Sequence, residues 1–144
     1  MAITASGLYC LNFKDILGND TAVDLLADTI KVALVTNSAT PNFDTERSWA
    51  NTYEVGSPSG GITLTTPTLT VSSGSLVFDG DDTAWGSQTI SGIRGCIIYD
   101  DTITTPYADP QICLVNFGSD YSVTSGVLTI QWHSSGIFAL DLTP

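Results

Sequence analysis

The chain has 144 residues, with 15 acidic residues against four lysines and arginines and one histidine, which gives a formal charge of −11 at pH 7. This length suffices for one domain with its own hydrophobic core, so folding requires neither a metal ion nor a disulfide. So acidic a surface disfavours nucleic acid and anionic membranes as partners, because both repel carboxylates. Threonine and serine make up about a quarter of the residues, as is typical of β-rich proteins with many turns.

The opening residues, MAITASG, lack the basic and apolar regions of a secretory signal, and no apolar run approaches the ~20 residues that span a bilayer. We therefore expect synthesis in a cytosol, with reduced cysteines. Cys96 and Cys113 lie within apolar runs, as small buried residues do. A hairpin of residues 94–100 and 111–117 would place them nearly opposite each other, so a disulfide stays open, although cytosolic proteins rarely keep one.

Residues 1–27 are expected to form an N-terminal arm that contains one short helix. The segment SGLYCLNFKDILG carries a candidate N-cap, Ser6, and a candidate helix end, Gly18. Its expected apolar face consists of Leu8, Leu11, Ile16 and Leu17.

The first strand is expected at TIKVALVT, residues 29–36, where Ile30, Val32 and Leu34 alternate with their neighbours. Residues 37–61 then form a long excursion without periodicity, a kind of segment that often contacts a partner. Its aromatic side chains either pack the loop onto its own domain, which we favour, or anchor another protein. For the second case we predict the following contact residues, two of them from the arm: Leu8, Tyr9, Phe43, Trp49 and Tyr53.

From Ile62 onward, short apolar runs with a period of two recur between glycine, proline, serine and aspartate residues. In the last third, Leu128, Ile130 and Trp132 are expected on one face, with tight turns at Ser125-Gly126 and at residues 134–136. About nine strands at this spacing predict an all-β fold: an antiparallel two-sheet β-sandwich, jelly-roll-like, in a single domain of residues 1–144.

Three carboxylates, Asp79, Asp81 and Asp82, stand directly before Trp85 in FDGDDTAW. The glycine and glutamate positions of an EF-hand loop are missing, so a looser calcium turn is the remaining metal hypothesis. A solvated turn is the simpler interpretation, because aspartate side chains accept hydrogen bonds from nearby backbone in turns. We expect no metal and no cofactor.

Catalytic signatures are weak. His133 is the single imidazole and has only chain neighbours as hydroxyl partners, while the cysteines show no zinc-ligand spacing. Phosphate-binding loops and nucleophile elbows do not occur. A carbohydrate platform of Trp49, Trp85 and Trp132 is the alternative outside the structural proteins, although Trp132 alternates in phase with core residues. We therefore expect a protein that is not an enzyme.

Several blocks of the chain, in order from about residue 28 to 142, resemble a family of small structural proteins encoded among the head and tail genes of tailed bacteriophages. The blocks are TIKVALVTNSATPNFDT, GGITL, FDGDDTAW, GCIIYDDT and LVNFGSDYSVTSGVLTIQWHSSGIFALDL. The segment VGSPSGG departs from the pattern expected there, where an aromatic residue often precedes the paired glycines.

The resemblance implies a capsid decoration, or cement, protein that binds the outside of the major capsid shell and carries no catalytic residues. It implies the major capsid protein as partner, a homo-oligomer such as a trimer, and a place on the capsid exterior of the virion after synthesis in the host cytoplasm. A tail structural component is the alternative within the same class.

Overall fold

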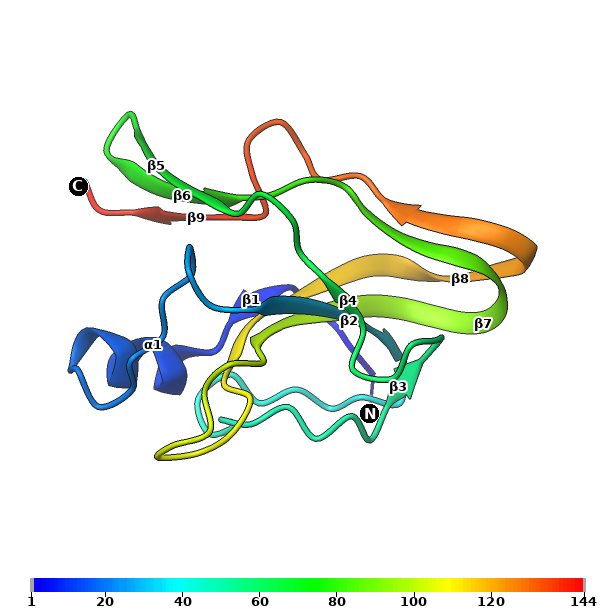
Figure 1. The fold of residues 1–144 in the computed structure, drawn as a ribbon, viewed down its shortest axis with the longest axis horizontal. Helices are drawn as coiled ribbons and strands as arrows, with labels where there is room; N and C mark the ends of the chain where they lie inside the picture. Colours follow the sequence, from blue (N-terminus) through cyan, green and yellow to red (C-terminus); the bar gives the residue numbers. More distant parts are fainter. Residues whose placement is uncertain (1, 144) are drawn as a thin grey trace.

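The computed structural model describes residues 2–143, which form nine strands and one helix in two layers (Figure 1). In chain order the elements are β1 (Gly7–Leu8), α1 (Cys10–Leu17), β2 (Ile30–Thr36), β3 (Glu54–Val55), β4 (Ile62–Thr63), β5 (Thr68–Ser72), β6 (Ser75–Asp79), β7 (Thr83–Asp100), β8 (Gln111–Ile130) and β9 (Phe138–Asp141). The larger sheet has the order β1-β8-β7-β2-β3, with β4 also paired to β2, and the smaller one has the order β5-β6-β9. All pairings are antiparallel. The predicted fold class, all-β with two antiparallel sheets and one short helix, is confirmed.

Strands β7 and β8 are much longer than the sequence pattern predicts, with 18 and 20 residues. Together they form a ribbon that bends back toward the smaller sheet, at the right of Figure 1. The register of the ribbon shifts at four places between Trp85 and Gly95, and such β-bulges allow both strands to bend without losing their pairing. The predicted turn at Ser125-Gly126 is wrong: Ser125 lies inside β8 with φ of 46°, as a bulge residue.

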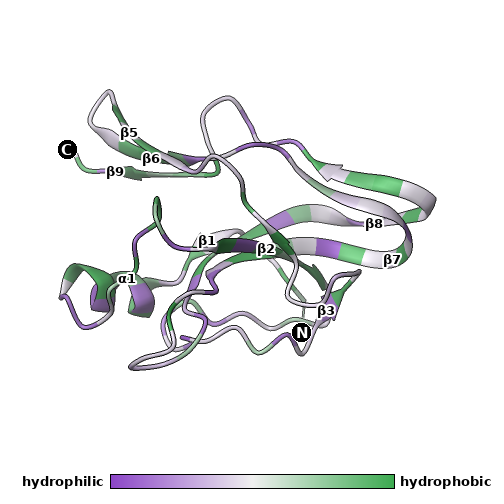
Figure 2. Cartoon of the chain, in the orientation of Figure 1, coloured by the Kyte–Doolittle hydropathy of each residue, from purple (hydrophilic) through white to green (hydrophobic). Residues whose placement is uncertain are grey.

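The inner face of the larger sheet points toward the smaller sheet. Here Ile30, Val32 and Leu34 of β2 pack with Phe78 and Trp85 in one fully buried cluster. Figure 2 shows hydrophobic residues in β2 on one side of this core and in β6 and β9 on the other. Leu128, Ile130 and Trp132 pack against the same cluster from one side of the chain, as the alternation predicts.

The outer face of the larger sheet is buried as well, but under irregular chain instead of a sheet. Ala33, Val35, Ile97 and Leu114 form a second cluster there with Ile3 and Tyr9, and further residues of the loop 37–53 pack onto it. Strand β2 is therefore covered on both sides, and the predicted strand at residues 29–36 is confirmed. Ile3 is 2% exposed and Tyr9 fully buried, so the N-terminal segment contributes to the core of its own domain.

Helix α1 exists but begins later than expected, and its expected apolar face is confirmed only in part, since Ile16 packs against the inner core together with Phe13. Tyr9 is the N-cap without a side-chain cap bond, whereas Ser6 accepts a hydrogen bond from the Asn116 N–H at 2.9 Å. Gly18 ends the helix as predicted and donates its N–H to the Lys14 carbonyl. The helix buries Asn12 and Asp15, while Leu17 of the expected apolar face is 82% exposed.

Candidate functional site

Four of the five predicted contact residues come together over the outer face. Tyr9, Trp49 and Tyr53 line a cavity of about 290 Å³, and Phe43 packs against Tyr9 with ring centroids 5.2 Å apart. Leu8 is separate, because it alternates with Tyr9 along the chain and packs against the inner-face cluster. We call the cavity the aromatic pocket; it is lined by Tyr9, Ala39, Thr40, Pro41, Glu46, Ser48, Trp49, Ala50, Thr52, Tyr53, Ile97, Gln111 and Leu114.

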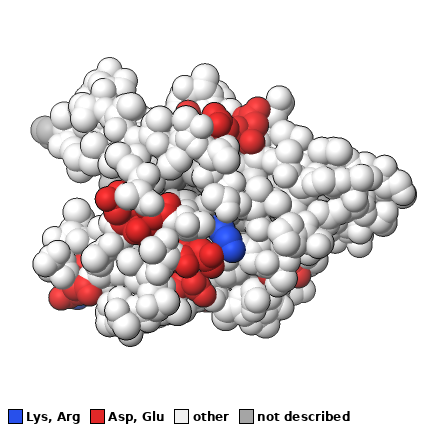
Figure 3. Space-filling model, viewed as in Figure 1, with Lys and Arg blue, Asp and Glu red and all other residues white. Residues whose placement is uncertain are grey.

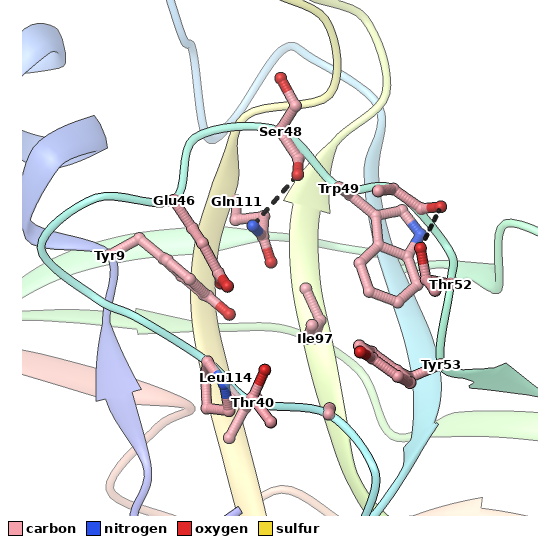
Figure 4. A pocket seen from close by; sticks show the side chains of 13 residues that line it. Tyr9, Thr40, Glu46, Ser48, Trp49, Thr52, Tyr53, Ile97, Gln111 and Leu114 are labelled. Carbon is pink, nitrogen blue, oxygen red and sulfur yellow. Dashed lines mark hydrogen bonds between the residues drawn. The ribbon is translucent and has the colours of Figure 1, made fainter. Parts of the chain in front are cut away.

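The floor of the aromatic pocket belongs to the sheet and its rim to the loop. Ile97 of β7 and Leu114 of β8 are directly paired and point outward together. Figure 4 shows the loop carrying Glu46, Ser48 and Trp49 around them. A rigid sheet thus supports side chains that an irregular segment presents, which is the usual construction of binding sites on β proteins.

Tyr9 lies at one end of the pocket, and both its backbone and its ring are fixed by neighbouring residues. Its backbone N–H donates to the Ile112 carbonyl at 3.0 Å, and the Phe43 ring packs on it. A Cβ on Gly7 would stand 2.8 Å from the Phe43 ring, so a larger residue there would displace that ring. The Tyr9 hydroxyl is buried without a hydrogen-bond partner. Burial, followed by the Glu46 carboxylate, holds the pKa of Tyr9 far above its usual value, so this hydroxyl keeps its proton.

Trp49 and Tyr53 form the opposite end of the pocket (Figure 4). Trp49 is half-buried and packs against Tyr99 of β7 with ring centroids 6.0 Å apart. Its backbone N–H donates to the Asp109 carbonyl at 2.8 Å, but its indole Nε1 is buried and has no partner. Tyr53 is 38% exposed. The pocket therefore contains a hydroxyl and an indole N–H that the domain itself does not satisfy, an arrangement that normally costs stability.

The polar lining of the aromatic pocket includes one charged group. The Glu46 carboxylate points toward the Tyr9 hydroxyl in Figure 4. Gln111 donates its side-chain amide to the Ser48 carbonyl at 3.2 Å, and Thr52 donates its hydroxyl to the Ala50 carbonyl at 3.3 Å, so these two groups shape the rim. Among the described residues, no lysine or arginine lies within ion-pair distance of Glu46.

A buried polar cluster, which the sequence analysis did not identify, holds the loop against α1. The Asp15 carboxylate accepts hydrogen bonds from Arg47 and from the Tyr107 hydroxyl, the latter at 3.0 Å. The Arg47 guanidinium also lies over the Tyr107 ring, 4.8 Å from its centroid. Asn12 donates to the carbonyls of Arg47 and Gln111, both at 2.7 Å. These bonds tie α1, the loop 37–53 and the connection between β7 and β8 into one unit, and thereby fix the pocket rim.

The stretch with Asp79, Asp81 and Asp82 connects β6 to β7, as a turn should. Its carboxylates have different partners: Asp81 accepts from the Thr66 hydroxyl at 2.6 Å and Asp82 from the Trp132 N–H at 3.0 Å. One carboxylate oxygen of Asp79 is buried without a partner. Within residues 2–143, no three His, Cys, Asp or Glu side chains are grouped so as to hold a metal ion.

The two buried cysteines are in unreactive surroundings, whereas Cys10 is exposed. All three cysteines are free, and Cys96 and Cys113 are buried on the inner face. They are not directly opposite, because Cys96 pairs with Val115 and Cys113 with Ile98. Burial raises the pKa of Cys113 to about 12 and that of Cys96 well above its usual value, so neither forms a thiolate near neutral pH. His133 lies exposed in the turn after β8 and accepts the Ser135 N–H at 3.1 Å.

The tryptophans do not form a common platform in the structure. Trp85 is 1% exposed in the inner core, and Trp132 is half-buried against the same core. Of the three, Trp49 alone lines the aromatic pocket.

Charged groups on the face shown in Figure 3 are mostly acidic and lie in separate patches, while the bent end of the β7–β8 ribbon at the right shows almost none. All four basic side chains are paired with aspartates: Lys14 with Asp15 and Asp20, Lys31 with Asp101, Arg47 with Asp15, and Arg94 with Asp120. Most carboxylates thus have no cation within the described chain. No helix in residues 2–143 has the length and apolar character to cross a bilayer.

Comparison with known proteins gives no match: no protein-family model, no curated protein and no solved structure is similar to this chain.

Proposed function

We propose that this protein is a non-enzymatic structural component of a virion, most specifically a capsid decoration protein that binds the outside of the major capsid shell and stabilises it. The observation that carries the proposal is the construction of the outer face. There, the loop 37–53 places the rings of Trp49 and Tyr53 and the Glu46 carboxylate around the aromatic pocket, on a rigid sheet. Aromatic residues in such a setting are the usual anchors of protein–protein contacts.

The resemblance to small phage head and tail proteins supports the same assignment. Its blocks coincide with the elements that build the domain: β2, the turn before β7, the end of β7, and the continuous segment from β8 to β9. A family defined by these blocks would therefore share the scaffold that supports the outer face.

The absence of an enzymatic role is proposed on chemical grounds. Neither buried thiol ionises near neutral pH, and His133 lies in an exposed turn after the end of β8, whereas Cys113 is near the start of that strand. The aspartates of the β6–β7 turn serve as acceptors for separate backbone and hydroxyl groups. These turn carboxylates are therefore not arranged as a catalytic acid and base.

A decoration protein acts by mass action, because it binds the assembled shell and not the loose subunits. One contact of standard size buries about 1,600 Å², and many copies multiply its effect. We propose a homo-oligomer, with a trimer as the specific form, on the capsid exterior, where an acidic surface does not face DNA.

Co-sedimentation with undecorated shells tests the proposal. Wild-type protein is expected to sediment with the shells and to raise their melting temperature. Tyr53→Ala, in the pocket, should weaken binding, whereas Tyr121→Ala, an exposed aromatic residue on the β7–β8 ribbon, should not. Binding to tails alone would replace the proposal by the tail component, binding to glycans and not to shells would replace it by a carbohydrate-binding module, and turnover of a substrate would refute it.

A further inference from the structure

We propose that the aromatic pocket binds the guanidinium group of an arginine side chain from a partner protein, with Glu46 as its carboxylate partner and the rings of Trp49 and Tyr53 as its walls. This inference deepens the proposed function and rests on it in one respect, since the arginine would belong to the shell subunit.

Charge complementarity favours a cation. Glu46 is the only acidic or basic residue, tyrosines aside, among those that line the pocket. Its nearest cationic neighbour in sequence, Arg47, turns instead to Asp15 and Tyr107 beside α1. The other basic residues are also paired elsewhere, so the described chain leaves Glu46 without a cation.

The shape and chemistry of the walls favour arginine over lysine. A guanidinium is planar and weakly hydrated, stacks on aromatic faces and presents two N–H groups side by side to a carboxylate. Trp49 and Tyr53 lie across the cavity from Glu46 and Tyr9 in Figure 4, so one group inserted between them can meet both a ring and the carboxylate. A lysine ammonium is a compact, strongly hydrated charge and would lose more hydration there.

The Glu46 carboxylate and the aromatic rings are the groups that a ligand in the pocket can meet. The Tyr9 hydroxyl lies beside the Glu46 carboxylate, and both this hydroxyl and the indole Nε1 of Trp49 are buried in the domain itself. Tyr53 is 38% exposed and Trp49 is half-buried, so their rings can stack on an inserted guanidinium while Glu46 accepts its N–H groups.

The size of the pocket agrees with one side chain. Its volume of about 290 Å³ is just below the range for pockets that hold drug-sized ligands, roughly 300–1,000 Å³. The apolar floor of Ile97 and Leu114 suits the methylene stem of an arginine.

The test is a titration of the isolated protein, followed by NMR on the Trp49 indole N–H resonance, which Trp49→Phe identifies. The probe is Nα-acetyl-arginine methylamide, compared with the uncharged citrulline analogue and the lysine analogue. Arginine should shift the resonance saturably with a dissociation constant on the order of millimolar, as a single-residue ligand allows. Citrulline should give no saturable shift, and lysine should bind more weakly than arginine.

Glu46→Gln should weaken arginine binding about tenfold, because a charge-assisted pair is lost. Asp44→Asn is the matched control: it removes the same charge from the same loop, at an exposed residue outside the pocket, and should change binding less than about twofold. Tyr53→Ala should also weaken arginine binding. Because Tyr53 is exposed, this variant should fold normally, so it tests the pocket even if the Glu46 variant does not fold.

The inference is overturned if arginine gives no saturable shift, if citrulline, lysine or a neutral sugar binds as well as arginine, or if the Asp44 variant loses as much affinity as the Glu46 variant. Because the titration contains no shells, its failure is distinct from a failure of shell binding. If the protein binds the arginine probe but does not sediment with shells, the arginine site is supported and the shell is ruled out as its partner.

Discussion

The two faces of the larger sheet are both buried, but by different means. The inner face packs aliphatic and aromatic side chains of β2, β7 and β8 against a second sheet. The outer face of the same strands is closed by residues 2–9 and the loop 37–53, held by the polar cluster around Asp15. Unpartnered atoms of Tyr9 and Trp49 occur on the outer side, next to a cavity.

Under the proposed function, the inner face provides stability and the outer face provides recognition. Close-packed apolar groups stabilise a fold but offer a partner nothing, since they are inaccessible. Loops that are fixed by a few buried polar bonds can instead present side chains whose own hydrogen-bonding capacity is left for a ligand. Variants of the inner core, and of the polar cluster that holds the loop 37–53, should therefore lose stability, whereas a variant at the exposed rim of the pocket should lose binding.

The largest loss of stability is expected for Trp85→Ala in the inner core. Trp85 is 1% exposed, and removal of its indole leaves a cavity among well-packed neighbours. The free energy of unfolding, measured by urea denaturation, should fall by about 3–5 kcal/mol. Trp49→Ala is the comparison on the outer face and should cost about 1 kcal/mol, because its ring is half-buried beside the pocket. Equal losses for both variants would contradict the distinction between the faces.

Asp15→Ala should cost about 3 kcal/mol in the same denaturation experiment. The substitution removes the common acceptor of Arg47 and Tyr107, and groups that lose a buried partner are costly. Asp20→Ala is the control, because Asp20 is exposed and also pairs with Lys14, and should change stability by less than about 0.5 kcal/mol. If Asp15→Ala lowers the free energy of unfolding no more than Asp20→Ala does, the polar cluster does not hold the loop 37–53 in place.

Asp100 predicts a pH dependence of stability. Its carboxylate is buried at the end of β7 and accepts the N–H of Thr102 at 2.8 Å. Burial, with a further contribution from the neighbouring Asp28, raises the pKa of Asp100 to about 6. The folded state thus binds the Asp100 proton more tightly than the unfolded chain does. The stabilisation of the folded state that this protonation provides is complete below pH ~4 and is lost as the pH rises through about 6.

The corresponding variant is Asp100→Asn, which keeps an oxygen acceptor for the turn without an ionisable group. Its stability should vary less between pH 4 and 7 than that of the wild type, with a gain on the order of 1–2 kcal/mol at pH 7. Thermal unfolding at several pH values measures this. An unchanged pH profile in the variant would assign the dependence to other groups.

Tyr53→Ala should have the smallest effect on stability, within about 0.5 kcal/mol, because the ring is at the rim of the pocket and 38% exposed. Its effect should appear in binding to shells and to arginine. A large loss of stability without a loss of binding would show that Tyr53 stabilises the fold and does not contact a partner.

The sequence was sufficient for the fold class and for local features that depend on nearby residues. Alternation located β2 and the inward direction of Leu128 and Ile130, and Gly18 marked the end of α1. Such patterns are reliable because side-chain direction in a strand follows directly from its period of two. The proposed grouping of Tyr9, Phe43, Trp49 and Tyr53 also has a counterpart in the structure, although their role as contacts stays a prediction.

The bent ribbon and the polar cluster could not be predicted in the same way. Gly92 and Ser125 have positive φ inside the long strands β7 and β8. Because residues with positive φ occur in turns as well as in bulges, the sequence around them was interpreted as the boundary between separate short strands. The sequence pattern did not single out Asn12 and Asp15, because their partners Arg47, Tyr107 and Gln111 are 32 to 99 residues away in sequence.

Imaging of intact particles tests the central claim most directly. The account predicts density for this protein on the outside of the shell, with α1 and the loop 37–53 turned toward the shell subunits and an arginine side chain in the aromatic pocket. Particles without this density, or density in which the pocket faces solvent and the bent β7–β8 ribbon makes the contact, would contradict it.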